Sequence, residues 1–388
     1  MKDQQFPPPL RGVDRNSFTY YSIVTRLPDI ARRTLAENDF SPPVVAALEA
    51  LIAEIPNGRI CPIIDPEAPD IAAWNEWTAV YATDNWLTVP WFFAETYFYR
   101  RIVAHTGWFQ NGRDPFAYQK QKGLTVSRPA IQALARSLTD ATLPYLLGIS
   151  LWGNQADLSL WPADGDEQPT HEHTEEQAAH LLVDDRSVLE AFLADQPYTR
   201  LDILLDNAGF EFVADLALAD YWLRQSETAV VHLHAKCHPT FVSDVILQDW
   251  EITHHFLKND PETAVQTLAH RLEQHQKNGR LHIHTHSYWT SPLPAWEMPP
   301  SLRQELAQAQ LVISKGDANY RRLLGDRHWP FTTPFPDATA YFPAPLLTLR
   351  TAKSEVAVGL TTSQITHLNQ KDPHWLTNGR WGFIQFRP

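Results

Sequence analysis

Cysteine is scarce in this sequence, because Cys61 and Cys237 are the only two among 388 residues. Two thiols cannot build a disulfide framework or a four-thiolate zinc site. Long hydrophobic runs are also missing, since no stretch approaches the roughly 18 uncharged apolar residues that span a bilayer. Residues 1–11 are polar and proline-rich and lack the apolar core of a signal peptide. We therefore expect a cytoplasmic protein that does not enter a membrane.

Positive charge is in short supply as well. The chain has 32 lysines and arginines against 45 aspartates and glutamates, which gives a formal net charge of −13. This charge argues against nucleic acid and anionic membranes as partners, because both are negative. An anionic substrate would need a local positive site. Hydrophobic residues still make up 44% of the chain, enough to bury the core of one large domain or of two ordinary ones.

Residues 1–160 have the pattern of a mostly helical N-terminal domain. Apolar residues recur at helical spacing in the segments 44–55, 91–107 and 127–138. An acidic and polar segment, residues 161–198, follows and has the composition of an exposed connection. The sequence therefore predicts a helical domain joined by this segment to what comes after.

From residue 199 onward, short apolar runs alternate with helical segments, which is typical of a parallel, doubly wound sheet. We therefore predict an α/β fold in which the helical N-terminal portion packs on a three-layer α/β/α doubly wound C-terminal domain, residues 199–388. This second domain would hold metal and phosphate. The expected strands are residues 201–205, 229–234, 281–285, 311–314, 346–349 and 381–386.

Polar residues follow four of these expected strands. Asp206 and Asn207 follow the first strand, and Asp244 comes after the second. Asp317 follows the fourth strand, and Lys353 follows the fifth. Ligands of doubly wound sheets bind at the carboxyl ends of the strands. The sequence therefore predicts that these residues meet at one edge of the sheet.

The chemistry of these residues favours the hydrolysis of phosphate esters. The oxygen atoms of Asp206, Asn207 and Asp244 suit Mg²⁺ or Mn²⁺, and such an ion polarises a phosphoryl oxygen and lowers the pKa of a bound water. Lys353 and Arg321 carry the positive charge that would offset the phosphate. Each motif also has an ordinary explanation, since an Asp-Asn pair after a strand is more often a turn or a helix cap.

Two groups of histidines offer an alternative metal site. Residues 171–173 read His-Glu-His, while His282, His284 and His286 alternate and would share one face of a strand. Three imidazoles on one face are able to bind Zn²⁺. The spacing in the first group is wrong for a helical pair, so we interpret it as a loop. We interpret the second group as a partly exposed sheet face, and Cys237 as a structural thiol.

At these residues the chain resembles the damage-control phosphatase family, and in particular its third subfamily, which includes the acidic-residue methyltransferase-like proteins. The resemblance covers most of the chain and follows one order of motifs, so it is specific. The matching segments are Pro90–Glu95 with Tyr99–Arg101, Leu151–Ser159, Asp206–Glu211, Pro239–Asp244, Lys315–Arg321, and Arg350–Lys353, which fits the Arg-Thr-x-Lys motif of the subfamily.

The resemblance implies hydrolysis of phosphomonoesters such as fructose 1-phosphate with a divalent ion, Mn²⁺ or Mg²⁺, or alternatively Co²⁺ or Ni²⁺. It implies that Asp206, Asn207 and Asp244 hold this ion, and that these three residues act in catalysis with Asp317 and Lys353. Either a metal-bound water or Asp206 itself would attack phosphorus. The implied contacts to a small phosphorylated metabolite come from Glu95, Asp317, Ala318, Asn319, Tyr320, Arg321, Arg350, Thr351 and Lys353.

Two other functions remain open at this point. A carboxyl methyltransferase activity with S-adenosylmethionine has been proposed for part of the branch, and Arg26 lies in an N-terminal helix where such a role would be sought. The sequence has no G-x-G-x-x-G loop that would support this hypothesis. The second alternative is a sensor that binds a sugar phosphate or a nucleotide without catalysis. The oligomeric state is not predicted by any of these patterns.

Overall fold

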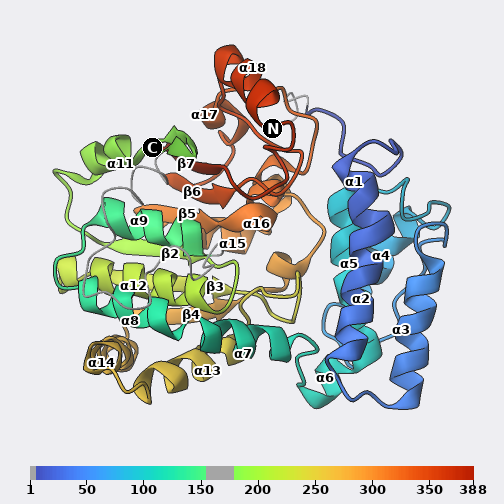
Figure 1. The fold of residues 1–388 in the computed structure, drawn as a ribbon, viewed down its shortest axis with the longest axis horizontal. Helices are drawn as coiled ribbons and strands as arrows, with labels where there is room; N and C mark the ends of the chain where they lie inside the picture. The colour runs from blue at the N-terminus through green and yellow to red at the C-terminus, as the bar shows by residue number, and fades with distance from the viewer. Residues whose placement is uncertain (1–5, 154–178) are drawn as a thin grey trace.

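In the computed structural model, which describes residues 6–153 and 179–388, short apolar runs form one seven-stranded sheet (Figure 1). The strand order across this sheet is β1-β7-β6-β5-β2-β3-β4. The central strands are buried on both faces, as expected of parallel strands between helices. The bounds are β1 (Leu181–Asp184), β2 (Arg200–Leu204), β3 (Val230–Ala235), β4 (Leu281–Thr285), β5 (Leu311–Lys315), β6 (Leu346–Thr351) and β7 (Gly382–Arg387).

The sheet is parallel from β6 to β4, as the sequence predicts, but it is mixed at the other edge. Strand β7 runs antiparallel to β6, and Thr351 pairs with Gly382. The connection between these two strands therefore begins and ends at the same edge of the sheet, and its helix α18 (Thr362–Lys371) does not cross a face. Strand β7 is therefore the exception to the parallel sheet that the sequence predicts. Strand β1, which pairs with β7, was not expected in the connecting segment.

Helices cover both faces of the sheet, which confirms the three-layer α/β/α architecture. On one face, Leu201 and Ile203 of β2 join a core that includes residues from the helices before and after the strand. On the other face, Leu204 and Val312 join a core with the helices that precede and follow β5. The first layer contains α8 (Arg128–Ser137), α9 (Leu143–Trp152), α11 (Arg186–Leu193), α12 (Phe210–Gln225), α13 (Leu247–Lys258) and α14 (Thr263–Lys277), and the second contains α15 (Pro300–Leu306) and α16 (Gly316–Leu324).

The helices of residues 18–106 lie together beside the sheet and share the second core, whereas Leu124 in the segment 117–126 belongs to the first (Figure 1). Helices α8 and α9 also belong to residues 1–160, yet they pack on the sheet beside α12. Helices from both sides of the boundary expected at residue 160 therefore pack on the sheet. The N-terminal elements are α1 (Phe18–Tyr21), the π-helical turn η1 (Ser22–Arg26), α2 (Leu27–Ala36), α3 (Pro42–Glu54), α4 (Ile71–Val80), α5 (Trp91–Thr106), α6 (Trp108–Asn111) and α7 (Ala117–Val126).

Helix α5 is the element that joins the N-terminal helices to the sheet. It is buried on almost every side, as its apolar composition predicts, and it ends at Gly107 in the left-handed region at φ 70°. Its residue Phe92 packs on Phe241 of the β3–α13 loop, with ring centroids 6.0 Å apart. Because α5 and this loop touch, a ligand site at the end of β3 has α5 as one of its walls. None of the described helices has the length and apolarity needed to cross a bilayer.

A buried group of charges reinforces this junction. The guanidinium of Arg100 on α5 forms ion pairs with Asp65 at 2.9 Å and Asp70 at 2.8 Å. His238 of the β3–α13 loop lies against this group, with Nε2 3.7 Å from Asp70 Oδ2. Burial, assisted by the charge of Arg100, lowers the pKa of His238 to about 4. The imidazole is therefore neutral when the protein is folded at neutral pH.

This lowered pKa predicts a loss of stability in mild acid. Unfolded His238 would take up a proton near its ordinary pKa of 6.5, whereas the folded protein resists protonation down to about 4. The stability contributed by neutral His238 is thus present above pH 6.5 and is lost as the pH falls towards 4. Between pH 7.5 and pH 5 the protonation of His238 should lower the free energy of unfolding by about 2 kcal/mol. Denaturant unfolding should show that His238→Gln reduces the pH dependence by this amount, whereas replacement of the exposed His255 should not.

Candidate active site

The loops after β2 and β3 are tied to one another by their backbones. Asn207 and Asp244 form an isolated antiparallel bridge. The amide of Ala208 donates to the carbonyl of Ser243 at 2.7 Å, and the amide of Val245 donates to the carbonyl of Asp206 at 2.8 Å. The structure thus brings together Asp206, Asn207 and Asp244, although 37 positions separate the last two in the sequence.

Three buried carboxylates crowd this edge of the sheet, from Asp206, Asp244 and Glu211 of α12. The side-chain amide of Asn207 donates to Asp206 Oδ2 at 2.6 Å and to Glu211 Oε2 at 2.8 Å. Burial raises the pKa of Asp206 well above its ordinary value, and repulsion from Glu211 and Asp244 raises it further. A cation among these oxygens would relieve that repulsion. The donor set therefore fits a hard divalent ion such as Mg²⁺ or Mn²⁺.

Other residues fix the orientation of these groups. Ser243 Oγ donates to Asn207 Oδ1 at 2.5 Å, and Lys236 Nζ lies 3.0 Å from Asp244 Oδ2. Behind them, Lys315 Nζ contacts Glu211 Oε1 at 2.8 Å and is fully buried. These contacts leave the carboxylates little freedom to rotate away from one another.

The backbone before Ser243 is strained. Phe241 and Val242 both have positive φ, at 46° and 67°. A β-branched residue rarely adopts the left-handed region, and such a conformation costs on the order of 1–3 kcal/mol. The turn places the aromatic ring of Phe241 in the wall of the cavity and Ser243 against Asn207. Strain of this kind at a cluster of charged residues is typical of a functional site.

Gly316, the first residue after β5, leaves room for the Asp206 side chain. Its φ is +77°, and a Cβ at this position would lie only 1.9 Å from Asp206 Oδ2. Any side chain here would therefore push the Asp206 carboxylate out of place. Gly316 is thus a position where the backbone approaches the Asp206 carboxylate closely.

Gly316→Ala is accordingly expected to lower catalytic efficiency by roughly 10²-fold or more, because even a 1 Å misplacement of a reacting group has effects of this size. Steady-state kinetics would measure the loss. Gly279→Ala is a matched control, since Gly279 also has positive φ, +67°, but has nothing within 4 Å of the added carbon. Equal kinetic losses in the two variants would mean that backbone strain, and not displacement of Asp206, is responsible.

The segment after β6 supports the other side of the site. Arg350 is buried, and its Nε donates to Asp317 Oδ1 at 2.8 Å. Ser354 Oγ donates to the same oxygen at 2.9 Å. Burial opposes ionisation of Asp317, but Arg350 and Arg321 outweigh it, and the pKa of Asp317 is lowered. Arg350 therefore holds Asp317 as a carboxylate and does not itself reach the cavity, while Thr351 lines it.

Arg321 lies in the cavity wall, but carboxylates already balance its charge. It forms two hydrogen bonds with Asp326, at 2.8 and 3.0 Å, and a short ion pair with Glu95. Its guanidinium also lies 3.6 Å from the ring centroid of Trp91. The sequence predicts that Arg321 offsets phosphate charge. Its partners in the structure indicate instead that it orients Glu95, which also lines the cavity.

Two of the residues expected to contact substrate lie beneath the site. Asn319 Nδ2 donates to the carbonyls of Leu205 at 3.0 Å and Lys315 at 2.9 Å, which joins the ends of β2 and β5. The hydroxyl of Tyr320 donates to Gln385 Oε1 at 3.0 Å. Both side chains are buried and neither lines the cavity. Their positions suit a role in holding the strand ends together.

A cavity of about 200 Å³ lies over these residues and contains two cations that stand apart from the carboxylate pairs. Within residues 6–153 and 179–388, neither Lys353 nor Arg26 forms an ion pair with a carboxylate. Arg26 lies over the ring of Phe18 at 5.4 Å, and its NH1 is 3.4 Å from Ser22 Oγ. The lining residues are Arg26, Trp91, Glu95, Tyr99, Leu151, Asp206, Asn207, Glu211, Phe241, Ser243, Asp244, Gly316, Asp317, Ala318, Arg321, Leu349, Thr351 and Lys353.

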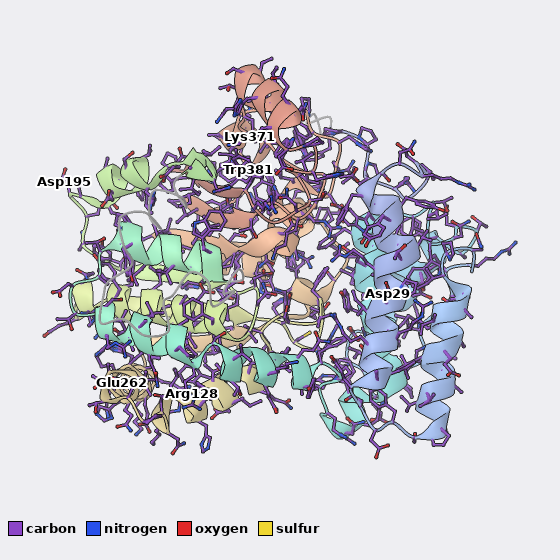
Figure 2. The ribbon with its side chains drawn as sticks, in the orientation of Figure 1. Asp29, Arg128, Asp195, Glu262, Lys371 and Trp381 are labelled. Carbon is purple, nitrogen blue, oxygen red and sulfur yellow. The ribbon has the colours of Figure 1, made fainter. Side chains whose placement is uncertain are left out.

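Several of these residues are not identified as functional by the sequence alone. Glu211 lies four residues after Asn207, a helical spacing that could have identified it. Ser243 precedes Asp244 and gave no separate signal. The sequence suggests Arg26 only for methyl transfer, because its position in the cavity follows from tertiary contacts that spacing does not reveal. A larger cavity of about 650 Å³ adjoins the first one and also includes Arg26, together with Asp29 on α2 (Figure 2).

The other metal candidates lie elsewhere. His282 and His284 are on β4 and His286 follows it, and none of them lines the cavity. The histidines of residues 171–173 lie outside the described residues. Burial raises the pKa of Cys237 to about 11, and its Sγ lies 3.1 Å from Thr290 Oγ1, as expected of a structural thiol.

Known proteins resemble this chain over nearly its whole length. Residues 19–368 match the damage-control phosphatase ARMT1-like domain. The mouse protein named damage-control phosphatase ARMT1 is 33% identical, over 97% of this chain and 98% of that protein. The human protein of the same name is 30% identical, over 98% of each chain. The crystal structure of a DUF89 family protein from Pyrococcus horikoshii has a TM-score of 0.51 at 14% identity, over 95% of this chain and 98% of that one, so it shares the fold.

Proposed function

This chain belongs to the damage-control phosphatase family with the ARMT1-like domain, and from that premise we propose that it is a divalent-metal-dependent phosphomonoesterase acting on small sugar phosphates, such as fructose 1-phosphate. One observation supports this proposal above the others. Three buried carboxylates and one amide converge in a cavity of about 200 Å³, and this cavity also contains Lys353, which forms no ion pair with any described carboxylate. In such a cavity the carboxylates complement the charge of a metal ion, and the lysine complements the charge of a phosphate dianion.

The oxygen atoms of Asp206, Asn207 and Asp244 would hold Mn²⁺ or Mg²⁺, with Co²⁺ or Ni²⁺ as alternatives. When bound, such an ion polarises a phosphoryl oxygen and lowers the pKa of water. Glu211 contacts the Asn207 amide at 2.8 Å and would keep that side chain in position. Lys236 Nζ lies 3.0 Å from Asp244 Oδ2 and would keep the Asp244 carboxylate in position.

The remaining groups would act on the substrate. Lys353 would offset the charge of the phosphoryl oxygens as it grows in the transition state. Arg350 holds Asp317 as a carboxylate. Asp317 would accept a hydrogen bond from the attacking water or from the leaving hydroxyl, and so would position it. Glu95 would accept hydrogen bonds from sugar hydroxyls, with Arg321 fixing its direction. Attack on phosphorus by Asp206 itself is the alternative route.

Release of inorganic phosphate tests this function. A panel of sugar phosphates should be hydrolysed with Mn²⁺ and should not be hydrolysed with a chelator. Binding of the same compounds without release would identify a sensor. Transfer of methyl groups from S-adenosylmethionine to a carboxylate without phosphate release would identify a methyltransferase. A cytoplasmic location stays a prediction of the sequence.

A further inference from the structure

A second group of metal-binding side chains lies at the β4 edge of the sheet. Strands β3 and β4 are parallel there, and His232 pairs with His282 while His234 pairs with His284. The four imidazoles lie on one face, and the rings of His232 and His284 are stacked with their centroids 4.9 Å apart. Leu233 between the two β3 histidines faces the opposite core. The histidines thus face the layer that contains α15.

Two of these imidazoles and one carboxylate are close enough to share an ion. His284 Nε2 lies 2.9 Å from His232 Nδ1. Glu305 of α15 completes the group, and the ligand atoms of the three residues lie within 4.8 Å of one another. All three side chains are half-buried, so solvent can reach the group. None of the three lines the cavity of the proposed phosphatase site.

We propose that His232, His284 and Glu305 form a second metal site, selective for a borderline transition ion such as Zn²⁺. Two imidazoles and one carboxylate, with a position left for water, are a recognised ligand set of zinc. Mg²⁺ and Mn²⁺ prefer oxygen ligands, so this group and the aspartate site select different ions. The site would connect β3, β4 and α15, and so would stabilise the exposed edge of the sheet.

The distances require only a small adjustment. Two nitrogens at tetrahedral positions around zinc, with bonds of about 2.0–2.1 Å, lie roughly 3.3 Å apart. The observed 2.9 Å separation between His284 Nε2 and His232 Nδ1 is that of a hydrogen bond, in which one nitrogen carries the proton. A metal ion would replace this proton and move the two rings apart by a few tenths of an ångström. At pH 7.5 histidine is ordinarily neutral, so the nitrogens can turn lone pairs to the ion.

One nearby cation opposes the binding of an ion. Arg200 NH2 lies 3.6 Å from Glu305 Oε1. Asp202 binds the same guanidinium through two hydrogen bonds, at 2.7 and 2.8 Å, and therefore takes up most of its charge. Asp202 also contacts His234 Nε2 at 2.9 Å, which keeps His234 out of the ligand set. Among the described residues, the one ion pair of Glu305 is this longer contact with Arg200, so Glu305 can turn to a metal.

Zinc stoichiometry tests the proposal directly. The purified full-length protein would be dialysed against micromolar Zn²⁺, and bound zinc would be counted by mass spectrometry. His284→Gln and Glu305→Gln, which change different elements, should each bind one zinc fewer than the wild type, with affinity reduced at least about 100-fold. His282→Gln is the matched control, because His282 lies in the same stack but outside the ligand set, and it should keep the full zinc content.

Thermal unfolding gives a second readout. Zinc should raise the melting temperature of the wild type and of His282→Gln. The part of this rise that comes from zinc at the proposed site should be missing in His284→Gln. All variants should melt together in a chelator, which would show that they fold. Equal zinc content in the wild type, His284→Gln and Glu305→Gln would overturn the proposal, as would an equal loss in His282→Gln. Phosphate release with Mg²⁺ should be unchanged in His284→Gln, so the two sites are tested separately.

Discussion

Replacement of Asp206 or Asp244 by asparagine is expected to reduce metal-dependent phosphate release by at least about 10²- to 10³-fold, the loss that follows removal of a single group stabilising the transition state. The two aspartates follow different strands, yet their loops are joined by an Asn207–Asp244 bridge and by the hydrogen bond from Val245 N to Asp206 O. The structure therefore allows one ion to contact both. Asparagine preserves shape and removes one charge, so the loss reflects binding of the ion.

A buried aspartate outside the cavity serves as the control. Asp260 is fully buried, accepts hydrogen bonds from Arg128 and Gln132 of α8, and does not line the cavity. Asp260→Asn should lower the melting temperature and leave kcat/KM of the folded protein nearly unchanged. Near-wild-type turnover by Asp206→Asn or Asp244→Asn at low Mn²⁺ would remove that residue from the metal site.

Lys353→Ala should lower kcat/KM by roughly 10²-fold, about 3 kcal/mol of transition-state stabilisation. The net charge of −13 disfavours a phosphate dianion, so a local cation has to offset it. Lys353 lines the cavity, and no carboxylate of the described ranges pairs with it. Arg321, in contrast, is neutralised by Glu95 and Asp326. We therefore expect Lys353 to contribute more to phosphate recognition than Arg321 does.

Two further variants separate phosphate recognition from surface charge. Lys353→Arg should recover only part of the activity, because guanidinium is planar and larger than ammonium. Lys371→Ala is the matched control, since Lys371 ends α18 near Trp381 and away from the cavity (Figure 2). Folding and metal affinity should be unaffected by any of these changes. Unchanged kinetics in a well-folded Lys353→Ala protein would assign the lysine to the solvated surface.

The sequence predicts the meeting of Asp206, Asp244, Asp317 and Lys353 because it depends on one rule, that parallel strands end at one edge. The sheet order β6-β5-β2-β3 satisfies this rule. Strands β3 and β4 lie on one side of β2, whereas β5 and β6 lie on the other. The strand order therefore reverses at β2, and such a reversal creates the opening for a ligand. Such a prediction needs only the strand positions, and short apolar runs identify those well.

The rest depends on contacts between distant segments. Arg321 was expected to bind phosphate, and only the fold shows that Glu95, 226 residues away, already pairs with it. Arg350 belongs to the Arg-Thr-x-Lys motif, yet it acts on Asp317 from below the cavity. The same holds for His232 and Glu305, whose approach to His284 depends on strand register and on the packing of α15. Local spacing carries no information on any of these pairs.

Anomalous diffraction from crystals soaked in Mn²⁺ tests the central claim most directly. We expect one strong manganese peak within bonding distance of Asp206, Asn207 and Asp244, in crystals of protein that releases phosphate with the same ion. The peak should disappear in Asp206→Asn and persist in His284→Gln. Manganese bound elsewhere in the active protein, with the space between these three side chains empty, would contradict it.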